Sequence, residues 1–342
     1  MTHHHPLRKI ALSLSLLGTA LLGIAGTTSA ATPHEPVLAA KQPLGRTVRS
    51  TARLNVVTSG TQTYTYTLLS YPGSLSTQGI GISPGAGGMG TQIVGAWNVG
   101  ESQTGFRASV WGKDVVRETY KLVNDPSAPV PQQPYSINDF GKIVGDYIDA
   151  SGIFHGYEMD VGGKFTPLEV PFAGAAGTYS PGISNAGEIT GGWFDSAGNS
   201  HGFTLGQGVY TSFDYPGAPY TDAYALNSEG DITGYYLDGG GNIHGFNRRR
   251  GVYTSIDYPG AIETFSVGIN DAGDMVGAYC MTSQCEATGQ GEQGFLLRNG
   301  VFTSFAIPGE FGTSLLSINN QGVLLGGYTD AAGNFYTFLA TP

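Results

Sequence analysis

The sequence predicts an all-β protein folded as a six-bladed β-propeller with four strands in each blade. Three observations lead to this fold class. The stretch 209–250 recurs in modified form from Val252, so the chain is a repeat array. Charged residues make up only 12% of the chain while glycine and aromatic residues are abundant, which is typical of short strands and turns. The two ends of the array also complement each other as parts of one blade.

The repeat is marked by a glycine that is followed two residues later by an aromatic residue. Six copies occur, 43 to 50 residues apart: Gly95 with Trp97, Gly145 with Tyr147, Gly191 with Trp193, Gly234 with Tyr236, Gly277 with Tyr279 and Gly326 with Tyr328. A period of this length in a strand-rich chain is typical of propeller blades.

Turn residues divide each repeat unit into four expected strands. In the unit around Gly234, these strands are 222–226, 231–237, 244–248 and 252–258. In every unit, a small residue precedes the Ile or Leu near the end of the first strand. These small residues are Gly81, Ser136, Gly182, Ala225, Gly268 and Ser317. First strands that converge on a narrow axis would require such small side chains, which favours a propeller over a sandwich.

The ends of the chain predict how the ring closes. The chain ends on a third strand, so the sixth blade lacks its fourth strand. Residues 64–71 match the fourth-strand pattern of residues 209–216. We therefore expect residues 64–71 to pair with 336–340 and to complete one domain that covers residues 62–342. Such closure removes sheet edges that would otherwise be open to aggregation.

Residues 1–30 are predicted to be a secretory signal peptide. Arg8 and Lys9 precede an apolar run over residues 10–24, and small residues follow up to Ala30. A membrane anchor is the alternative, and the small residues at the end favour cleavage. No later apolar stretch approaches the eighteen or so residues that a spanning helix needs. We expect a secreted protein that is extracellular, periplasmic or held at the cell surface.

Residues 31–61 alternate little and contain Pro and Gly, so a flexible leader is expected there. The formal charge of the whole chain is -10. Without Arg8 and Lys9, 14 basic residues face 26 acidic ones, and the net charge becomes -12. This acidic balance disfavours nucleic acid and anionic lipid as partners. A monomer is expected.

The two cysteines, Cys280 and Cys285, are close in sequence. In an exported protein, this spacing favours a disulfide over a metal site, because zinc would need further Cys or His ligands nearby. A loop this short gains only about 2 kcal/mol from closure. The disulfide is therefore predicted to restrain one loop and not to hold the fold.

The recurrent pieces GIN-x-x-G, IVG-x-Y and H-G-F resemble the HAF repeat family of extracellular bacterial repeats, named for a His-Ala-Phe tripeptide. The tripeptide here is His-Gly-Tyr at His155 and His-Gly-Phe at His201 and His244. Thr104, Gln293 and Tyr336 occupy the His position in three other units. The resemblance covers nearly all of residues 64–342. It implies export and repetition, and it transfers no catalytic residue.

An aspartate precedes the His position by six residues in four units: Asp149, Asp195, Asp238 and Asp330. These carboxylates could form a ring of cation ligands, with calcium as the candidate ion. The favoured interpretation is that each Asp begins a tight turn, and no D-x-D-x-D-G calcium loop is present. No cofactor is therefore expected. The repeated His is likewise predicted to be structural, because a catalytic group is needed once per site and not once per blade.

A specific function should lie where the repeats differ. The link 123–135 into the second blade is long and Pro-rich, residues 280–292 replace a simple turn in the fifth blade, and residues 84–90 form a Gly-rich loop that is a weak phosphate-loop candidate. The first two departures are expected on one face, with exposed contacts for a sugar or peptide at Tyr220, Asp222, Glu263, Phe265, Glu310 and Phe311. The alternative is a merely variable surface.

The sequence therefore favours a binding or interaction module for a glycan or another extracellular ligand. The first alternative is a carbohydrate-active hydrolase or lyase that uses carboxylates and His155, His201 or His244 at the mouth of the ring. No G-x-S-x-G or H-E-x-x-H motif supports an enzyme. The second alternative is a structural repeat protein of the cell surface.

Overall fold

In the computed structural model, the described residues are 54–57, 63–69, 74, 76–85, 91–99, 102–110, 119–124 and 132–342. The predicted signal peptide 1–30 and most of the leader lie outside these residues. So do most of the Gly-rich loop 84–90 and much of the Pro-rich link 123–135.

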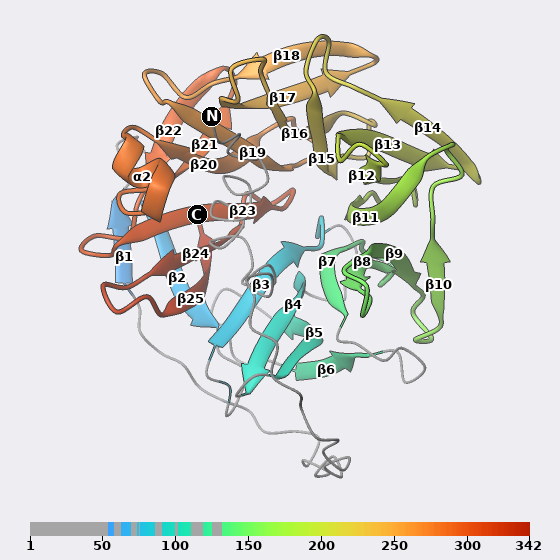
Figure 1. The fold of residues 1–342 in the computed structure, drawn as a ribbon. Coiled ribbons are helices and arrows are strands. Elements are labelled where there is room, and N and C mark those ends of the chain that lie inside the picture. The colour runs from blue at the N-terminus through green and yellow to red at the C-terminus, as the bar shows by residue number, and fades with distance from the viewer. Residues whose placement is uncertain are drawn as a thin grey trace, which may run out of the picture.

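The strands form six blades that are arranged in a ring around a central axis (Figure 1), and a single bridge between Ser200 and Tyr220 joins the third and fourth blades into one sheet. Each blade has its first strand at the axis and its fourth at the rim. Blade 1 contains β3 (Ser76–Ile82), β4 (Thr91–Val99), β5 (Ser102–Val110) and β6 (Thr119–Val123). Blade 2 contains β7 (Gln133–Ile137), β8 (Ile143–Ile148), β9 (Phe154–Met159) and β10 (Phe165–Leu168). Blade 3 contains β11 (Ala175–Ile183), β12 (Ile189–Asp195), β13 (Ser200–Gly206) and β14 (Val209–Phe213).

The second half of the ring repeats this order. Blade 4 contains β15 (Tyr220–Leu226), β16 (Ile232–Leu237), β17 (Ile243–Arg249) and β18 (Val252–Ile256). Blade 5 contains β19 (Glu263–Ile269), β20 (Met275–Cys280), the short helix α2 (Ser283–Thr288), β21 (Gln293–Arg298) and β22 (Val301–Phe305). Blade 6 contains β23 (Gly312–Ile318), β24 (Leu324–Thr329), β25 (Phe335–Thr341) and, from the other end of the chain, β2 (Thr63–Leu69) and β1 (Leu54–Val57). The prediction of an all-β, six-bladed propeller is confirmed.

Closure of the ring follows the predicted pairing. Strand β2 lies antiparallel to β25, with Tyr66 opposite Ala340 and Leu68 opposite Phe338. The ring is therefore joined by hydrogen bonds between the two ends of the domain, as Figure 1 shows on its left side. Strand β1 then pairs with β2 and gives blade 6 a fifth strand. The expectation of a flexible leader up to residue 61 is wrong for these four residues, because the open edge of β2 offers them backbone partners.

The repeated glycine of each second strand has a steric cause. Every described first strand contains a register shift in its pairing with the second strand, such as the one between Ala223 and Ala225. At that point, a carbonyl of the first strand presses on the glycine. A Cβ on Gly234 would lie 1.9 Å from the Asp222 carbonyl oxygen, and one on Gly277 would lie 1.8 Å from that of Phe265. Only a residue without a side chain fits there.

The small residues of the first strands also act as predicted. A Cβ on Gly81 would lie 2.2 Å from the carbonyl oxygen of Tyr135 in the next blade, and one on Gly182 would lie 2.9 Å from that of Tyr224. First strands of neighbouring blades thus approach backbone to backbone around the axis.

The apolar core lies between adjacent blades. Val94 of blade 1 packs with Ile137 and Ile143 of blade 2, and Val144 of blade 2 packs with Ile183 of blade 3. The aromatic residue of the His-Gly-Phe tripeptide, or its equivalent, is buried in all six blades: Phe106, Tyr157, Phe203, Phe246, Phe295 and Phe338. The repeated tripeptide is therefore first a packing motif.

Candidate functional site

The antiparallel strands give the ring two distinct faces. The turns from second to third strand, such as 238–242, and the links between blades, such as 214–219, lie on one face, which we call the link face. The turns from first to second strand, such as 227–230, lie on the other face, which we call the Asn-turn face. The candidate groups of this protein are distributed over both faces and the interior.

Three consecutive blades carry a histidine held between two carboxylates on the link face. His155 Nδ1 is 2.7 Å from Glu169 Oε1, and its Nε2 is 3.2 Å from Asp149 Oδ2. In blade 3, His201 lies 2.8 Å from Asp214 and 3.5 Å from Asp195. In blade 4, His244 lies 2.8 Å from Asp257 and 3.5 Å from Asp238. We call these three sets the histidine clusters.

Each histidine also stacks on the aromatic residue of the second strand. The ring centroids are 5.1 Å apart for Tyr147 and His155, 4.4 Å for Trp193 and His201, and 5.1 Å for Tyr236 and His244. Both ring nitrogens and one ring face are therefore occupied. This arrangement agrees with the prediction that the repeated histidine is structural.

The histidine clusters remain half-exposed. The histidine side chains are 23% to 28% exposed, and the link carboxylates of Glu169, Asp214 and Asp257 are 47% to 49% exposed. Burial acts to lower the pKa of His155, but the hydrogen bonds that its imidazole donates to the carboxylates of Glu169 and Asp149 outweigh burial and raise that pKa above its ordinary value. The clusters thus present accessible acceptors on a rigid framework.

The four aspartates of the second-to-third-strand turns perform turn chemistry, as predicted. Asp238 Oδ1 accepts backbone N–H bonds from Gly240 at 2.8 Å and from Asn242 at 2.9 Å. The same two bonds form at Asp149, Asp195 and Asp330. Bonds from the Asn242 side chain and backbone lower the pKa of Asp238 to about 2. Among the described residues, no group of three His, Cys, Asp or Glu side chains has the geometry of a metal site.

Blades 5 and 6 replace the histidine with neutral side chains. Tyr279 OH donates to Gln293 at 2.8 Å, and Tyr336 OH donates to Asp330 at 3.2 Å. In blade 6, Tyr336 still stacks on Tyr328, with ring centroids 5.0 Å apart. The charged histidine clusters are thus confined to blades 2, 3 and 4 in the described part of the chain.

The predicted exposed contacts are mostly buried. Tyr220, Asp222, Glu263 and Phe265 are less than 8% exposed, and only Glu310 and Phe311 remain partly accessible. The expectation of an exposed surface at the first four is wrong, because first strands begin deep in the ring between two neighbouring blades. Tyr220 and Phe265, for example, both pack against the Tyr235 ring.

Buried carboxyls are a feature that the sequence reasoning missed. Burial raises the pKa of Asp222 to about 7 and that of Glu292 to about 7, and Ser314 Oγ donates to Glu292. Burial also raises the pKa of Asp146 well above its ordinary range. The sequence contained a signal for one of these carboxyls. Asp146 directly follows the repeated glycine, and the residue at this position is Gly, Ala or Tyr in the other blades.

The departure in blade 5 is a braced loop at the link face. The predicted disulfide between Cys280 and Cys285 is present, and Thr282 caps the helix α2 through a bond to the Cys285 N–H. Gly291 N–H donates to the Phe311 carbonyl at 2.8 Å, and the Glu292 carbonyl accepts from Thr313 N–H at 2.9 Å. The loop therefore joins blade 5 to the first strand of blade 6.

Replacement of Cys280 and Cys285 by serine is expected to loosen this loop without unfolding the ring. The loss should be about 2 kcal/mol or less, because the closed loop is short. Hydrogen exchange should rise over residues 281–292 and stay unchanged over blades 2 and 3. Global unfolding of the double serine variant at room temperature would show that the disulfide holds the fold.

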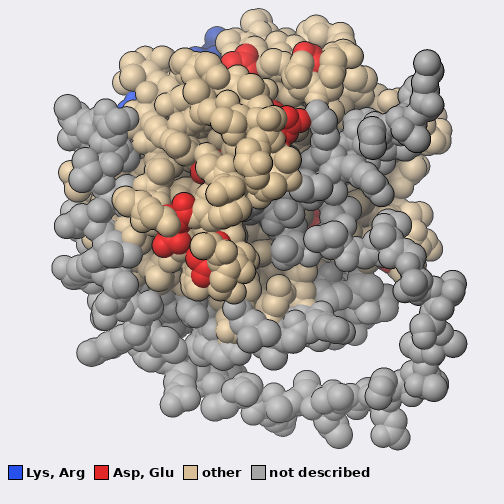
Figure 2. Space-filling view, turned by 60° about the vertical axis from the view of Figure 1, so that its left-hand side comes forward, with Lys and Arg blue, Asp and Glu red and all other residues tan. Residues whose placement is uncertain are grey.

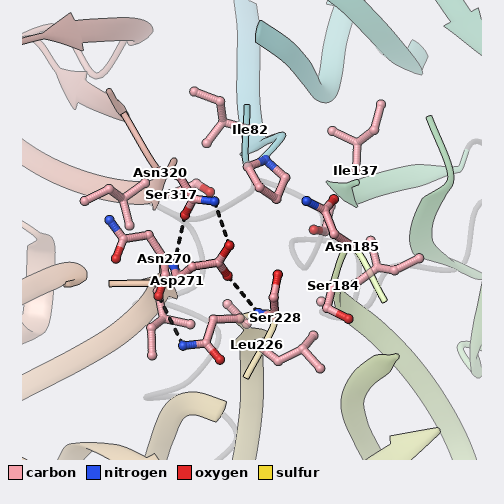
Figure 3. A pocket seen from close by; sticks show the side chains of 18 residues that line it. Ile82, Ile137, Ser184, Asn185, Leu226, Ser228, Asn270, Asp271, Ser317 and Asn320 are labelled. Carbon is pink, nitrogen blue, oxygen red and sulfur yellow. Dashed lines mark hydrogen bonds between the residues drawn. The ribbon is translucent and has the colours of Figure 1, made fainter. Parts of the chain in front are cut away.

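A pocket opens on the axis at the Asn-turn face, opposite to the face on which the ligand contacts were expected. Figure 3 shows its rim, to which Ser184, Asn185, Ser228, Asp271 and Asn320 contribute. Its volume is about 40 Å³. A water molecule needs on the order of 10–15 Å³ of such space, so the pocket holds about three waters and no sugar ring.

A belt of hydrogen bonds between blades surrounds this pocket. The side-chain amides of Asn138, Asn227 and Asn270 each donate at 3.2 Å to a carbonyl of the next blade. Asp271 and Asn320 add two further bonds across the seam between blades 5 and 6 (Figure 3). Among these fully described turns, no equivalent bond joins blade 3 to blade 4, because Ser184 replaces the asparagine.

Replacement of Ser184 by asparagine is expected to stabilise the protein. The new amide should donate to the Asn227 carbonyl as Asn227 itself donates to Asn270. One added hydrogen bond contributes about 1 kcal/mol, which corresponds to a rise in Tm of about 2–4 °C. The reverse change, Asn227→Ser, should lower Tm by a similar amount in thermal unfolding. An unchanged or lowered Tm for Ser184→Asn would contradict the role of the belt.

The described surface is sparsely charged and mainly acidic. On the side of the ring seen in Figure 2, Asp and Glu lie in several separate groups, while Lys and Arg appear near one edge. No helix of the described residues has the length and apolar character needed to cross a membrane.

Comparisons with known proteins add little beyond this geometry. A scan of family models and a search of curated proteins find no match.

The solved structures similar to this chain include TolB from Acinetobacter baumannii, with 14% identity and a TM-score of 0.49 over 76% of this chain. This chain spans 65% of the TolB chain. AofleA from Arthrobotrys oligospora has 11% identity and a TM-score of 0.49, covering 79% of this chain and 84% of that one. A fungal lectin from Aleuria aurantia, described as a six-bladed propeller with a novel fucose recognition mode, has 9% identity and a TM-score of 0.48, covering 77% and 91%. The fold assignment therefore depends on the strand pairing of the chain itself.

Proposed function

We propose that the protein is an exported binding module that recognises a glycan through the three histidine clusters. The observation that carries this proposal is the recurrence of one half-exposed set, a histidine with a link carboxylate, on three consecutive blades. A structural need alone does not require it, because Gln293 and Tyr336 fill the same place in blades 5 and 6.

The chemistry of the clusters suits a polyhydroxylated ligand. The exposed oxygens of Glu169, Asp214 and Asp257 can accept hydrogen bonds from sugar hydroxyls, which are neutral donors. Each carboxylate is held in place by a histidine at 2.7 or 2.8 Å, so little freedom is lost on binding. Three similar weak sites on one rigid face would strengthen binding to a repeating glycan by multivalency.

Export and the nature of the repeats belong to the same proposal. The apolar run 10–24 after Arg8 and Lys9, together with the disulfide, supports passage into an oxidising compartment. The tripeptides at His155, His201 and His244 support repeats of the HAF type. The acidic surface supports a neutral ligand over nucleic acid.

The test is binding to a glycan array by the full chain and by the double variant Asp214→Asn, Asp257→Asn. We expect the variant to lose at least tenfold in affinity for the glycan that the unmodified protein binds, with Tm nearly unchanged. Glu229→Gln, an exposed carboxylate on the Asn-turn face, serves as the matched control and should bind normally. An array without any bound glycan would overturn the proposal, as would release of new reducing ends from a polysaccharide that is lost in His201→Ala, which would indicate an enzyme.

A further inference from the structure

The histidine clusters of blades 3 and 4 have the same polar groups but a different aromatic neighbour. Each contains a histidine, a turn aspartate, a link aspartate and a serine of the fourth strand: His201, Asp195, Asp214 and Ser212 in blade 3, and His244, Asp238, Asp257 and Ser255 in blade 4. The ring that stacks on the histidine is Trp193 in blade 3 and Tyr236 in blade 4. Blade 2 is less comparable, because Glu169 and Pro167 replace the link aspartate and the serine.

In blade 4, the link aspartate is held through both of its oxygens. Asp257 Oδ1 lies 2.8 Å from His244 Nδ1, and Asp257 Oδ2 accepts a hydrogen bond from the Ser255 hydroxyl at 2.7 Å. The Tyr236 hydroxyl lies 3.2 Å from Ser255 Oγ. Because the serine hydroxyl has one proton and directs it to Asp257, the tyrosine is the donor in this last contact. Tyr236 and Ser255 therefore form a short relay of hydrogen bonds that ends on the carboxylate.

In blade 3, the indole turns the serine away from the link aspartate. Trp193 Nε1–H donates to Ser212 Oγ at 3.0 Å, and Ser212 Oγ donates to the Gly202 carbonyl at 3.3 Å. An indole N–H can only donate, so Ser212 takes the orientation in which it accepts, and its own proton points to Gly202. Asp214 Oδ1 lies 2.8 Å from His201 Nδ1, and Asp214 Oδ2 accepts no hydrogen bond from the described residues.

Blade 5 repeats the tyrosine relay with a different final acceptor. Tyr279 OH donates to Ser304 Oγ at 2.9 Å, and Ser304 Oγ donates to Gln293 Oε1 at 2.7 Å. Ala306 stands at the place of the link aspartate. In both blades with a stacking tyrosine, the serine thus donates into the cluster, whereas the serine beside the tryptophan does not.

The two link aspartates therefore differ in what they can offer to a ligand. Their side chains are almost equally accessible, at 49% exposed for Asp214 and 47% for Asp257. A carboxylate has about four lone-pair sites on its two oxygens. A sugar hydroxyl that binds Asp257 shares an oxygen with His244 or Ser255, whereas Asp214 has one whole oxygen available.

We propose that blade 3 provides the principal glycan contact of these two blades, with Asp214 as the acceptor and Trp193 as the positioning residue that keeps this acceptor free. The inference rests on the proposed function and assigns unequal roles to two of its clusters. A sugar hydroxyl donates to Asp214 Oδ2, and blade 4 adds a weaker contact at Asp257.

The test is isothermal titration calorimetry of the full chain, with the soluble oligosaccharide that gives the strongest signal on the glycan array as the probe. Asp214→Asn should weaken binding about tenfold or more, because the amide can present donors where the sugar hydroxyl needs an acceptor. Asp257→Asn, the matched change in blade 4, should weaken binding less than about threefold. Both side chains are half-exposed, so both variants are expected to fold, and thermal unfolding checks this.

Further variants examine the role of Trp193. Trp193→Tyr should reproduce the relay of blade 4, in which the serine donates to the link aspartate, and should weaken binding about fivefold. Addition of Ser212→Ala to Trp193→Tyr removes the relay and should restore the affinity to within about twofold of the unmodified protein. A purely structural role of Trp193 would not give this restoration. Ser255→Ala frees Asp257 and should leave binding equal or stronger.

Two results would overturn the unequal roles while glycan binding by the clusters stands. One is an equal loss of affinity for Asp214→Asn and Asp257→Asn. The other is a loss in Trp193→Tyr that Ser212→Ala does not restore, although the double variant unfolds at the same Tm as Trp193→Tyr. An array without any bound glycan would instead overturn the proposed function itself, and this inference with it.

Discussion

Replacement of Gly234 by alanine is expected to cost at least about 3 kcal/mol of folding free energy and to lower Tm by roughly 10 °C. The new Cβ would lie 1.9 Å from the Asp222 carbonyl oxygen and 2.9 Å from the Phe246 ring. That carbonyl belongs to the first strand, which is packed against both neighbouring blades and cannot retreat without disturbing them. The cost therefore exceeds the usual cost of one extra methyl group in a core.

Gly239→Ala provides the matched control for this prediction. Gly239 lies in the turn of the same blade, a Cβ there would meet no atom within 4 Å, and its φ is not in the left-handed region. The Tm of the Gly239→Ala variant should stay within about 2 °C of that of the unmodified protein, since such a change acts mainly on the unfolded chain. If thermal unfolding shows a similarly small change in Tm for both variants, the first strand can move away from the new methyl group at little cost in folding free energy.

Stability is expected to fall as pH rises from 5 to 8. Asp222 and Glu292 have folded pKa values of about 7, against ordinary values of 3.8 and 4.5. Between these values, the folded protein binds more protons than the unfolded chain, so the free energy of unfolding decreases with pH and levels off above about pH 7. Each carboxyl contributes up to about 1.4 kcal/mol per pH unit within this window.

Other titrating groups do not reverse this direction. The pKa of His155 is raised, so its contribution is also lost as pH rises through that value. Asp195 and Asp238 have pKa values lowered to about 2, so their stabilisation is lost only below about pH 4, outside the range tested.

Two isosteric variants test the assignment of this pH dependence. Asp222→Asn and Glu292→Gln should each reduce the decrease in Tm between pH 5 and pH 8, and the double variant should reduce it most, with the remainder due to Asp146 and His155. Glu229→Gln, an exposed carboxylate, should retain the full decrease. A Tm that rises from pH 5 to pH 8, or a decrease that is equal in all variants, would show that the two buried carboxyls are not responsible.

Features that depend on one repeat unit were predictable from the sequence. The strands of blade 4 lie within two residues of the expected bounds, and Asp238 and Asn227 act in turns as their places in the pattern indicated. The partners of the histidines were missed, although Asp214 and Asp257 follow their histidines at the same interval of 13 residues. That regular interval is the signal that could have identified them.

The sequence by itself determined the number of blades, the pairing of residues 64–71 with the last strand and the disulfide, because each of these follows from a local sequence pattern or from the period of the repeat. Only the tertiary structure decided that Tyr220, Asp222, Glu263 and Phe265 are buried and that Asp146 and Glu292 are buried carboxyls. The physical reason is that packing between blades brings together side chains from different repeat units. A pattern read along the chain shows what each blade contains, but not which of its side chains the next blade covers.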